Sequence, residues 1–303
     1  MSHEQYLAEE VGLDFADGII ARREALRRLG LMGMSTVAAT SLLAACSKRG
    51  AQVSTPGPSA TSPSASASGP DPGPSGAVAT EAVTFPSPNG TVMGAWAPAR
   101  GETRGGVIVI HENRGLNDWV RSVAGRLARD GYAALAVDLL SEEGGTGRFS
   151  DPAEATAALG KVPEERFVRD MKAGMTELGR RLPDRKLGTV GFCFGGGQVW
   201  QLLASGEPRL AAAAPFYGPS PEAPDFSGSR AAVLAIYGEL DSRVTGGRQV
   251  VLDALEKAKL PHEVKIYKGA DHAFFNDTGP RYNAEASRAA YADLLGWFGR
   301  YLA

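Results

Sequence analysis

Cys193 lies in a setting that is typical of a nucleophile. It is the centre of the sequence GFCFG at positions 191–195, which follows a strand-like run at 187–192 and precedes a helical stretch from Gln198. This is the G-x-S-x-G elbow with Cys in place of Ser. A sharp strand-to-helix turn requires very small residues two positions before and after the nucleophile, and the helix N-terminus favours a thiolate and an oxyanion. An isolated Cys is more often a buried packing residue than a nucleophile. The interpretation of Cys193 as a nucleophile therefore depends on its place in this elbow.

An acid and a base follow Cys193 in the chain order that this elbow requires. Asp241 and His272 each come directly after an expected strand, which places both side chains at the carboxyl edge of the sheet. The separations, 241 − 193 = 48 and 272 − 241 = 31 residues, suit about one more strand-and-helix step each. Asp271 competes with Asp241 for the role of acid, but its position beside His272 favours a role in shaping the loop.

The choice of base is small, because only three histidines lie beyond the N-terminal segment. His262 starts an expected strand at the wrong edge of the sheet and is predicted to be a surface residue. His111 begins HENRG, and His-Glu opens a known zinc motif, but position 115 is Gly instead of the second His, so we expect no metal. In this fold the loop supplies an oxyanion N–H instead, and the backbones of Asn113 and Phe194 are the expected donors.

Strand-like and helix-like segments alternate from residue 81 onward. Strands are expected at 81–85, 91–97, 106–110, 132–139, 187–192, 210–217, 231–237 and 263–267, and helices at 119–130, 163–182, from 198, at 247–259 and at 284–302. Asn-Gly at 89–90 marks a tight hairpin, and 141–161 reads as a Gly-rich excursion. Strands that alternate with helices of this length imply crossover connections. The pattern predicts one doubly wound α/β domain at 81–303, with a mostly parallel sheet and helices on both faces.

The first 45 residues resemble an export signal of the twin-arginine type. Arg22-Arg23 precedes an uncharged run at 29–45 that is short and weakly apolar for a spanning helix. The sequence LAAC at 43–46 resembles a bacterial lipobox, in which Cys46 is lipidated and becomes the mature N-terminus. An ordinary amphipathic helix and a plain cleavage site are the alternatives. We expect an exported protein of the cell envelope that one lipid holds at a membrane surface.

The composition separates a linker from the folded domain and excludes several classes of protein. Residues 46–80 contain mainly Ser, Pro, Gly and Ala and are predicted to be a disordered spacer. The whole chain has 303 residues, with 32 basic against 34 acidic side chains and 43% hydrophobic residues. Such a chain can bury a substantial core but has no basic stripe, which argues against nucleic-acid binding. Coiled coils and polytopic membrane proteins are excluded by the same numbers.

Four motifs together resemble the dienelactone hydrolase family of α/β-hydrolases. They are HENRGLN at 111–117, the Cys193 elbow, YGELD at 237–241 and DHAF at 271–274, and they spread over nearly all of 81–303. The resemblance implies an α/β-hydrolase fold, a triad of Cys193, His272 and Asp241, and no cofactor. It also implies that Glu112 contacts the resting Cys193 and takes its proton when substrate binds.

One position departs from the family pattern. Enzymes of the family that open dienelactone bind the substrate carboxylate with two Arg, one of them four residues after the catalytic His, where this chain has Asn276. Arg148, Arg166 or Arg281 could supply a replacement charge. Because a buried carboxylate needs a cation, we expect uncharged esters or lactones to be better substrates than the dienelactone carboxylate.

The sequence therefore favours an exported, membrane-tethered hydrolase of a small-molecule ester or lactone, acting through an acyl-enzyme on Cys193. Two alternatives stay open. The chain could be a lipid-anchored binding module that kept the pocket without turnover, or the same triad could cleave a thioester or a peptide.

Overall fold

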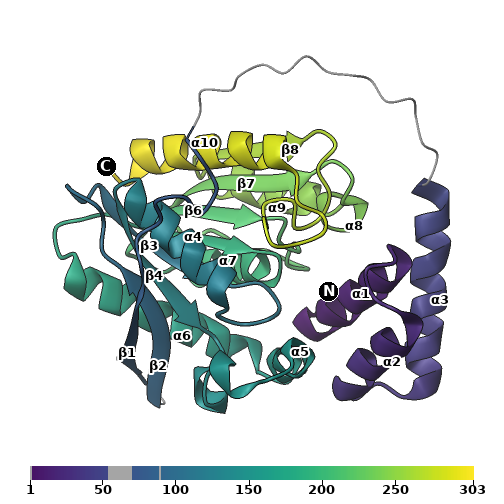
Figure 1. Cartoon of the computed structure of the whole chain (residues 1–303). Helices are drawn as coiled ribbons and strands as arrows, with labels where there is room; N and C mark the ends of the chain where they lie inside the picture. The colour runs from purple at the N-terminus through teal and green to yellow at the C-terminus, as the bar shows by residue number, and fades with distance from the viewer. Residues whose placement is uncertain (1, 54–69, 89) are drawn as a thin grey trace.

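The sheet has eight strands in the order β1-β2-β4-β3-β5-β6-β7-β8 (Figure 1). The computed structural model describes residues 2–53, 70–88 and 90–303. The first strand pairs antiparallel with the second, which pairs antiparallel with β4, and all other neighbours in the sheet are parallel. This confirms the predicted doubly wound, mostly parallel sheet.

The elements agree with the predicted segments to within about two residues at most ends. The strands are β1 (Glu81–Ser87), β2 (Gly90–Ala97), β3 (Gly105–Ile110), β4 (Tyr132–Asp138), β5 (Leu187–Phe192), β6 (Leu210–Phe216), β7 (Ala232–Gly238) and β8 (His262–Tyr267). The helices of this domain are α4 (Asp118–Arg129), α5 (Pro152–Gly160), α6 (Glu164–Arg181), α7 (Phe194–Ala204), α8 (Ser242–Thr245), α9 (Arg248–Lys257) and α10 (Ala284–Tyr301).

Helices cover both faces of the sheet, as two neighbouring glycines of β3 show. A Cβ atom at Gly105 would come within 2.8 Å of Leu302, which follows α10. A Cβ atom at Gly106 would come within 2.7 Å of Leu182, which follows α6. Since successive strand residues point to opposite faces, α10 and α6 lie on opposite sides of the sheet. The central strands β3, β4 and β5 are fully buried, as their continuous apolar sequences predict.

Helix α5 was not predicted. It lies inside the expected Gly-rich excursion, and its start has two residues that commonly begin a helix. Asp151 caps the helix by accepting a hydrogen bond from the N–H of Ala153 at 2.9 Å, and Pro152 occupies the first turn. An Asp-Pro pair before a run of Ala was therefore a readable helix start.

The N-terminal residues form three helices, α1 (His3–Ala16), α2 (Arg22–Leu31) and α3 (Thr36–Val53) (Figure 1). Helix α1 packs against α5 and α7, and its Tyr6, Leu7 and Val11 side chains are buried. Cys46 of α3 is buried against α1, so close to Gly12 that a Cβ atom at Gly12 would lie 2.6 Å from the Cys46 Sγ. Among the described residues no helix combines the length and the apolar character that crossing a membrane requires. The export signal and the lipidation of Cys46 stay predictions.

The spacer predicted at 46–80 differs from the structure at both ends. Helix α3 continues to Val53, and the residues after 70 follow α4, where Arg126 Nη1 donates to the carbonyl of Pro72 at 2.6 Å. The N–H of Val78 donates to the carbonyl of Gly125 at 2.9 Å. The part of the predicted spacer at 54–69 lies outside the described residues. Contacts with the folded domain thus extend about ten residues before its predicted start at 81, because the side chains of α4 bind the backbone of Pro72 and Ser75.

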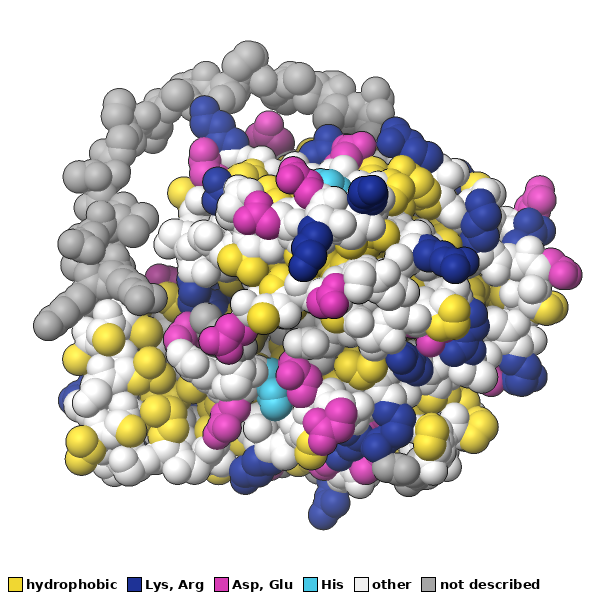
Figure 2. All heavy atoms as spheres, turned by 180° about the vertical axis from the view of Figure 1, so that it is seen from behind, with side chains coloured by type: hydrophobic (Ala, Val, Ile, Leu, Met, Phe, Trp, Pro, Cys, Tyr) yellow, Lys and Arg dark blue, Asp and Glu magenta, His cyan; other side chains and the backbone are white. Residues whose placement is uncertain are grey.

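Basic and acidic side chains are interspersed over the surface in the view of Figure 2. The mixture fits the near-balance of charges in the sequence. A basic stripe of the kind that follows a nucleic-acid backbone is not evident on this face.

Candidate active site

Cys193 occupies a strained turn between β5 and α7. Its backbone has a φ of 57°, in the left-handed region that non-glycine residues avoid. A Cβ atom at Gly191 would lie 2.2 Å from the carbonyl oxygen of Gly195, and a Cβ at Gly195 would lie 2.4 Å from that of His111. The glycines two residues before and after Cys193 therefore have the steric reason that the sequence predicted.

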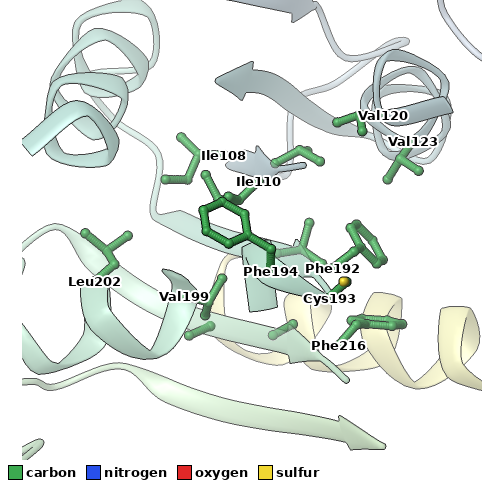
Figure 3. Close-up of a cluster of buried hydrophobic side chains, with 14 of the residues drawn as sticks. Ile108, Ile110, Val120, Val123, Phe192, Cys193, Phe194, Val199, Leu202 and Phe216 are labelled. Carbon is green, nitrogen blue, oxygen red and sulfur yellow. The ribbon is translucent and has the colours of Figure 1, made fainter. Parts of the chain in front are cut away.

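Aromatic side chains surround the base of this turn. Figure 3 shows the Cys193 sulfur at the end of β5, beside the rings of Phe192 and Phe216. Only 3% of Cys193 is exposed. The N–H of Cys193 donates to the carbonyl of Phe216 at 3.0 Å, which ties the turn to β6. A tightly packed surround of this kind holds a strained residue in place.

The imidazole of His272 and the carboxylate of Asp241 form a close pair. Nδ1 of His272 lies 2.6 Å from Oδ2 of Asp241, and both side chains are buried. The other oxygen of Asp241 accepts the N–H of Val244 at 3.2 Å, so the carboxylate is fixed from two sides. Asp271 instead accepts the backbone N–H of His272 at 2.6 Å. Asp241 therefore faces the ring, and Asp271 holds the loop.

The pair sets the charge of His272. Burial alone would lower the pKa of the imidazole, but the charges of Asp241 and Cys193 and the hydrogen bonds to them raise it to about 9. His272 is then protonated at neutral pH. An imidazolium can donate its proton to a leaving group.

Glu112 lies beside the same site, at the end of β3. Its carboxylate accepts hydrogen bonds from Asn276 Nδ2 at 2.8 Å and from the Tyr217 hydroxyl at 3.3 Å. Burial raises the pKa of Glu112, against the lowering effect of the Asn276 hydrogen bond. The resemblance implied a contact with Cys193; the hydrogen bonds that the structure gives Glu112 go to Asn276 and Tyr217. Asn276 thus binds Glu112, and it does not supply the positive charge of the Arg that dienelactone-opening members of the family have at this position.

His111 fixes the loop that carries one expected oxyanion donor. Its Nε2 accepts the N–H of Leu139 at 3.1 Å, so Nδ1 carries the proton and donates to the carbonyl of Glu112 at 2.7 Å. Burial lowers the pKa of His111, which keeps the ring neutral. The ring also stacks on Phe194, with 6.1 Å between centroids. His111 therefore joins the two segments that hold Asn113 and Phe194, a role that the sequence analysis missed.

The three candidate arginines bind other partners. Arg148 donates to the carbonyl of Glu143 at 2.9 Å. Arg166 grips the Glu143 carboxylate with two bonds of 2.6 and 2.7 Å. Arg281 lies 3.1 Å from Asp14 of α1. None of these three guanidinium groups has a recorded contact with Cys193 or His272 in the described part of the chain.

Helix α1 contributes three side-chain contacts at the site that the sequence analysis did not foresee. The Tyr6 hydroxyl lies 3.2 Å from Cys193 Sγ and 3.3 Å from His272 Nε2. Oε1 of Glu10 lies 3.5 Å from the same nitrogen and forms an ion pair with Arg243 of α8. Because residues 1–45 resemble an export signal, their sequence gives no sign that they pack against the folded domain.

Glu10, Cys193 and His272 also form a donor set that could hold a metal ion, since their ligand atoms all lie within 4.8 Å of one another. In this structure the same three side chains are already contacted by the hydroxyl of Tyr6 and the guanidinium of Arg243. The imidazole of His272, the thiol of Cys193 and the carboxylate of Asp241, which meet at this edge of the sheet, can perform nucleophilic acyl transfer without a metal.

Comparison with known proteins gives a consistent result. A protein of Escherichia coli O157:H7 described as a candidate carboxymethylenebutenolidase is 33% identical over 208 residues, which cover 64% of this chain and 76% of that protein. A protein of Synechocystis with the same description is 30% identical over 240 residues, or 73% of this chain and 96% of that protein. The homologues support hydrolase activity.

Solved structures agree with this result. A candidate dienelactone hydrolase from Klebsiella pneumoniae aligns with a TM-score of 0.65 and 27% identity, covering 73% of this chain and 98% of its own. The dienelactone hydrolase-like promiscuous phosphotriesterase P91, from metagenomic libraries, aligns with a TM-score of 0.63 and 25% identity, covering 75% of this chain and all of its own. Residues 94–302 match the dienelactone hydrolase family itself. The chain therefore belongs to the dienelactone hydrolase family and has its α/β-hydrolase fold.

Proposed function

We propose that this protein hydrolyses an ester or a lactone through a covalent acyl-enzyme on Cys193. The observation that carries the proposal is the geometry of three side chains. Cys193 stands in a left-handed elbow, and His272 and Asp241 form a 2.6 Å pair at the same edge of the sheet. This order and placement of nucleophile, acid and base is the one used by α/β-hydrolases.

In the first half of the reaction the Cys193 thiolate attacks the acyl carbon, and the carbonyl oxygen becomes an oxyanion. The backbone N–H groups of Asn113 and Phe194 stabilise that charge. The C–O bond to the leaving alcohol then breaks, the alkoxide takes the proton from His272 Nε2, and a thioester to Cys193 remains. In a lactone the leaving alcohol stays attached to the acyl group.

In the second half a water molecule attacks the thioester and gives its proton to His272, which now acts as a base. The C–S bond breaks, the acid leaves, and the thiolate–imidazolium pair is restored. Asp241 keeps Nδ1 of His272 protonated and the ring oriented throughout both steps.

Glu112 is proposed to act before this cycle, as the base that receives the thiol proton when substrate arrives and returns it to the Cys193 thiolate after the acid has left. Three features support the role: the raised pKa of Glu112, its position after β3, and the hydrogen bond that it accepts from the Tyr217 hydroxyl. The pKa of Tyr217 is itself raised, by burial and by the charges of Glu112 and Cys193.

A substrate screen tests the proposed function. The purified protein and a Tyr6→Ala/Glu10→Ala variant, in which these two side chains of α1 no longer contact Cys193 and His272, are assayed with short-chain p-nitrophenyl esters, with simple lactones and with thioesters. Turnover of an ester or lactone that is lost on alkylation of Cys193 is the expected result. Faster cleavage of thioesters or peptides would favour the alternative bond types, and binding without turnover of any compound would favour a binding module.

The pH profile of the reaction follows from the pKa of His272. Because the leaving group takes its proton from the imidazolium, kcat/KM should fall as the pH rises through about 9, where His272 loses that proton. The measurement is kcat/KM of one uncharged ester between about pH 6 and 10. A profile that instead rises steadily through that range would show that a neutral His272 is the active form.

We also propose that the protein is exported and held at a membrane surface by a lipid on Cys46. The sequence around Arg22-Arg23 and at 43–46 supports this proposal. The protein should sediment with membranes and be released by detergent but not by salt, and Cys46→Ala should leave it soluble or unprocessed. Recovery of the wild-type protein from the cytosol with its first 45 residues intact would contradict the proposal.

A further inference from the structure

The hydroxyl of Tyr6 occupies the position beside Cys193 and His272 that the reacting group of a substrate would need. It contacts Cys193 Sγ and His272 Nε2 at 3.2 and 3.3 Å, so it uses both of the groups proposed to perform the chemistry. Tyr6 is only 1% exposed, and burial raises the pKa of its hydroxyl well above the usual value, so it stays neutral. A substrate cannot reach the sulfur while this ring is present, because two groups cannot fill one volume.

Glu10 lies one helical turn further along α1 and places a carboxylate in the same site. Its Oε1 is 3.5 Å from His272 Nε2 and within 4.8 Å of Cys193 Sγ. The guanidinium of Arg243 binds this carboxylate and also lies over the Tyr6 ring, 4.4 Å from its centroid. Arg243 thus holds a carboxylate within 4.8 Å of the Cys193 sulfur.

Arg243 is built to receive an anion. It is about nine-tenths buried, and Glu10 is the carboxylate that pairs with it in the described part of the chain. Its Nε and Nη1 atoms are buried there without a hydrogen-bond partner, so the guanidinium has unused donors. A buried cation that loses its counter-charge is strongly unfavourable. When α1 leaves, an anionic group of a ligand would restore the pairing.

Beside the site, the contacts of α1 with the neighbouring loop include ion pairs. Asp14 and Asp17 follow Glu10 at intervals of four and three residues, which puts the three carboxylates on one face of the helix. Arg281 pairs with Asp14 at 3.1 Å and with Asp17 at 2.5 Å. An acidic helix face therefore meets two arginines beside the site.

We propose that α1 is an internal pseudosubstrate, in which Tyr6 covers Cys193 and Glu10 occupies an anion subsite formed by Arg243. This inference rests on the proposed function, since it assigns a substrate property to the same site. It also changes the expectation drawn from Asn276. The chain has a cation for an anionic substrate after all, but Arg243 supplies it from α8.

Two alkylating agents test both halves of the proposal without depending on ester turnover. Iodoacetamide is neutral, and iodoacetate carries a carboxylate on the carbon that the thiolate attacks. In each case an S–C bond forms and iodide leaves. The rate of labelling is followed on the peptide that contains Cys193, which separates it from Cys46. The full-length wild type is compared with Tyr6→Ala/Glu10→Ala and with Gln5→Ala, an exposed position on the same helix.

The double variant should label with iodoacetamide roughly tenfold faster than wild type or more, because the fraction of open sites limits the rate. Gln5→Ala should label like wild type. Equal labelling rates in the double variant and the wild type would show that α1 does not cover Cys193, provided that the melting temperatures show both proteins to be folded.

The anion subsite is read from the ratio of the iodoacetate rate to the iodoacetamide rate, in which the opening of α1 cancels. Adding Arg243→Gln to the double variant should lower this ratio by roughly tenfold, because the charged pair is lost. Arg243→Lys should retain part of the ratio, since it keeps the charge but not the planar fork. A ratio that does not respond to Arg243→Gln would refute the subsite.

Ester assays on the same variants separate this proposal from the proposed function. If labelling behaves as expected but no ester or lactone is cleaved by any variant, the proposed function fails and the pseudosubstrate stands. If wild type cleaves esters and the double variant is no faster in hydrolysis or labelling, the proposed function stands and the pseudosubstrate fails.

Discussion

Replacing Cys193 by Ala should lower kcat/KM for the best ester substrate by roughly three orders of magnitude or more, as loss of a nucleophile does when the triad acts as a unit. Cys193 is the residue at the strained elbow, where φ is 57°, and an Ala side chain there has no atom that can form the proposed acyl-enzyme. Ala keeps the Cβ and fits the space, so the melting temperature should change little. Steady-state kinetics and thermal melting on the same preparation provide the measurement.

The comparison needs a partner variant and a background in which the site is open. His272→Ala should cost about as much as Cys193→Ala, and combining the two should cost little more. Both are measured in the wild-type chain and in Tyr6→Ala/Glu10→Ala, so that α1 does not hide the loss. A Cys193→Ala protein with full ester activity would mean that the site assignment is wrong.

The positions of the three candidate catalytic residues could be predicted, because each residue directly follows a strand or lies in the loop after one. The elbow follows β5, Asp241 follows β7 and His272 follows β8, and parallel strands bring these ends to one edge of the sheet. The spacing of small residues around Cys193 also had one steric meaning, which the backbone distances at Gly191 confirm. These inferences needed only local patterns and the rule for connecting them.

The contacts of Glu112 and Arg243 could not be predicted, because they depend on which distant segments meet. Glu112 finds Asn276 across 164 positions of the chain, and Arg243 finds Glu10 across 233. Neither pair has a spacing or a motif that reveals it. Arg243 lies two residues after the YGELD motif at 237–241, and its charge alone does not distinguish it from the other arginines of the chain.

The two interpretations of the N-terminal segment are compatible. A signal that is cut before Cys46 would take α1 with it, since Tyr6 and Glu10 both lie upstream of that position. The export proposal and the pseudosubstrate proposal then combine: the chain would be blocked until processing and open afterwards. The loss of the Glu10 carboxylate at that step would leave Arg243 to bind an anionic ligand.

Changing Asp241 to Asn should lower kcat by roughly a thousandfold or more, the scale typical of losing a triad carboxylate. The substitution keeps the size of the side chain, and its amide oxygen can still accept the N–H of Val244. An amide facing His272 Nδ1 no longer stabilises the imidazolium and can reverse which ring nitrogen is protonated. Since the charge of Asp241 helps to raise the pKa of His272 to about 9, the alkaline fall in kcat/KM should move to lower pH.

Asp271→Asn is the matched control, because it removes one carboxylate charge from the residue next to His272. Asp271 accepts the backbone N–H of His272, and the amide oxygen of Asn can accept the same bond. The control should therefore lose far less activity and keep the alkaline fall near pH 9. If instead Asp271→Asn has the larger effect on kcat and on the pH profile, Asp271 is the acid of this site. The 2.6 Å contact between Asp241 and His272 would then be structural.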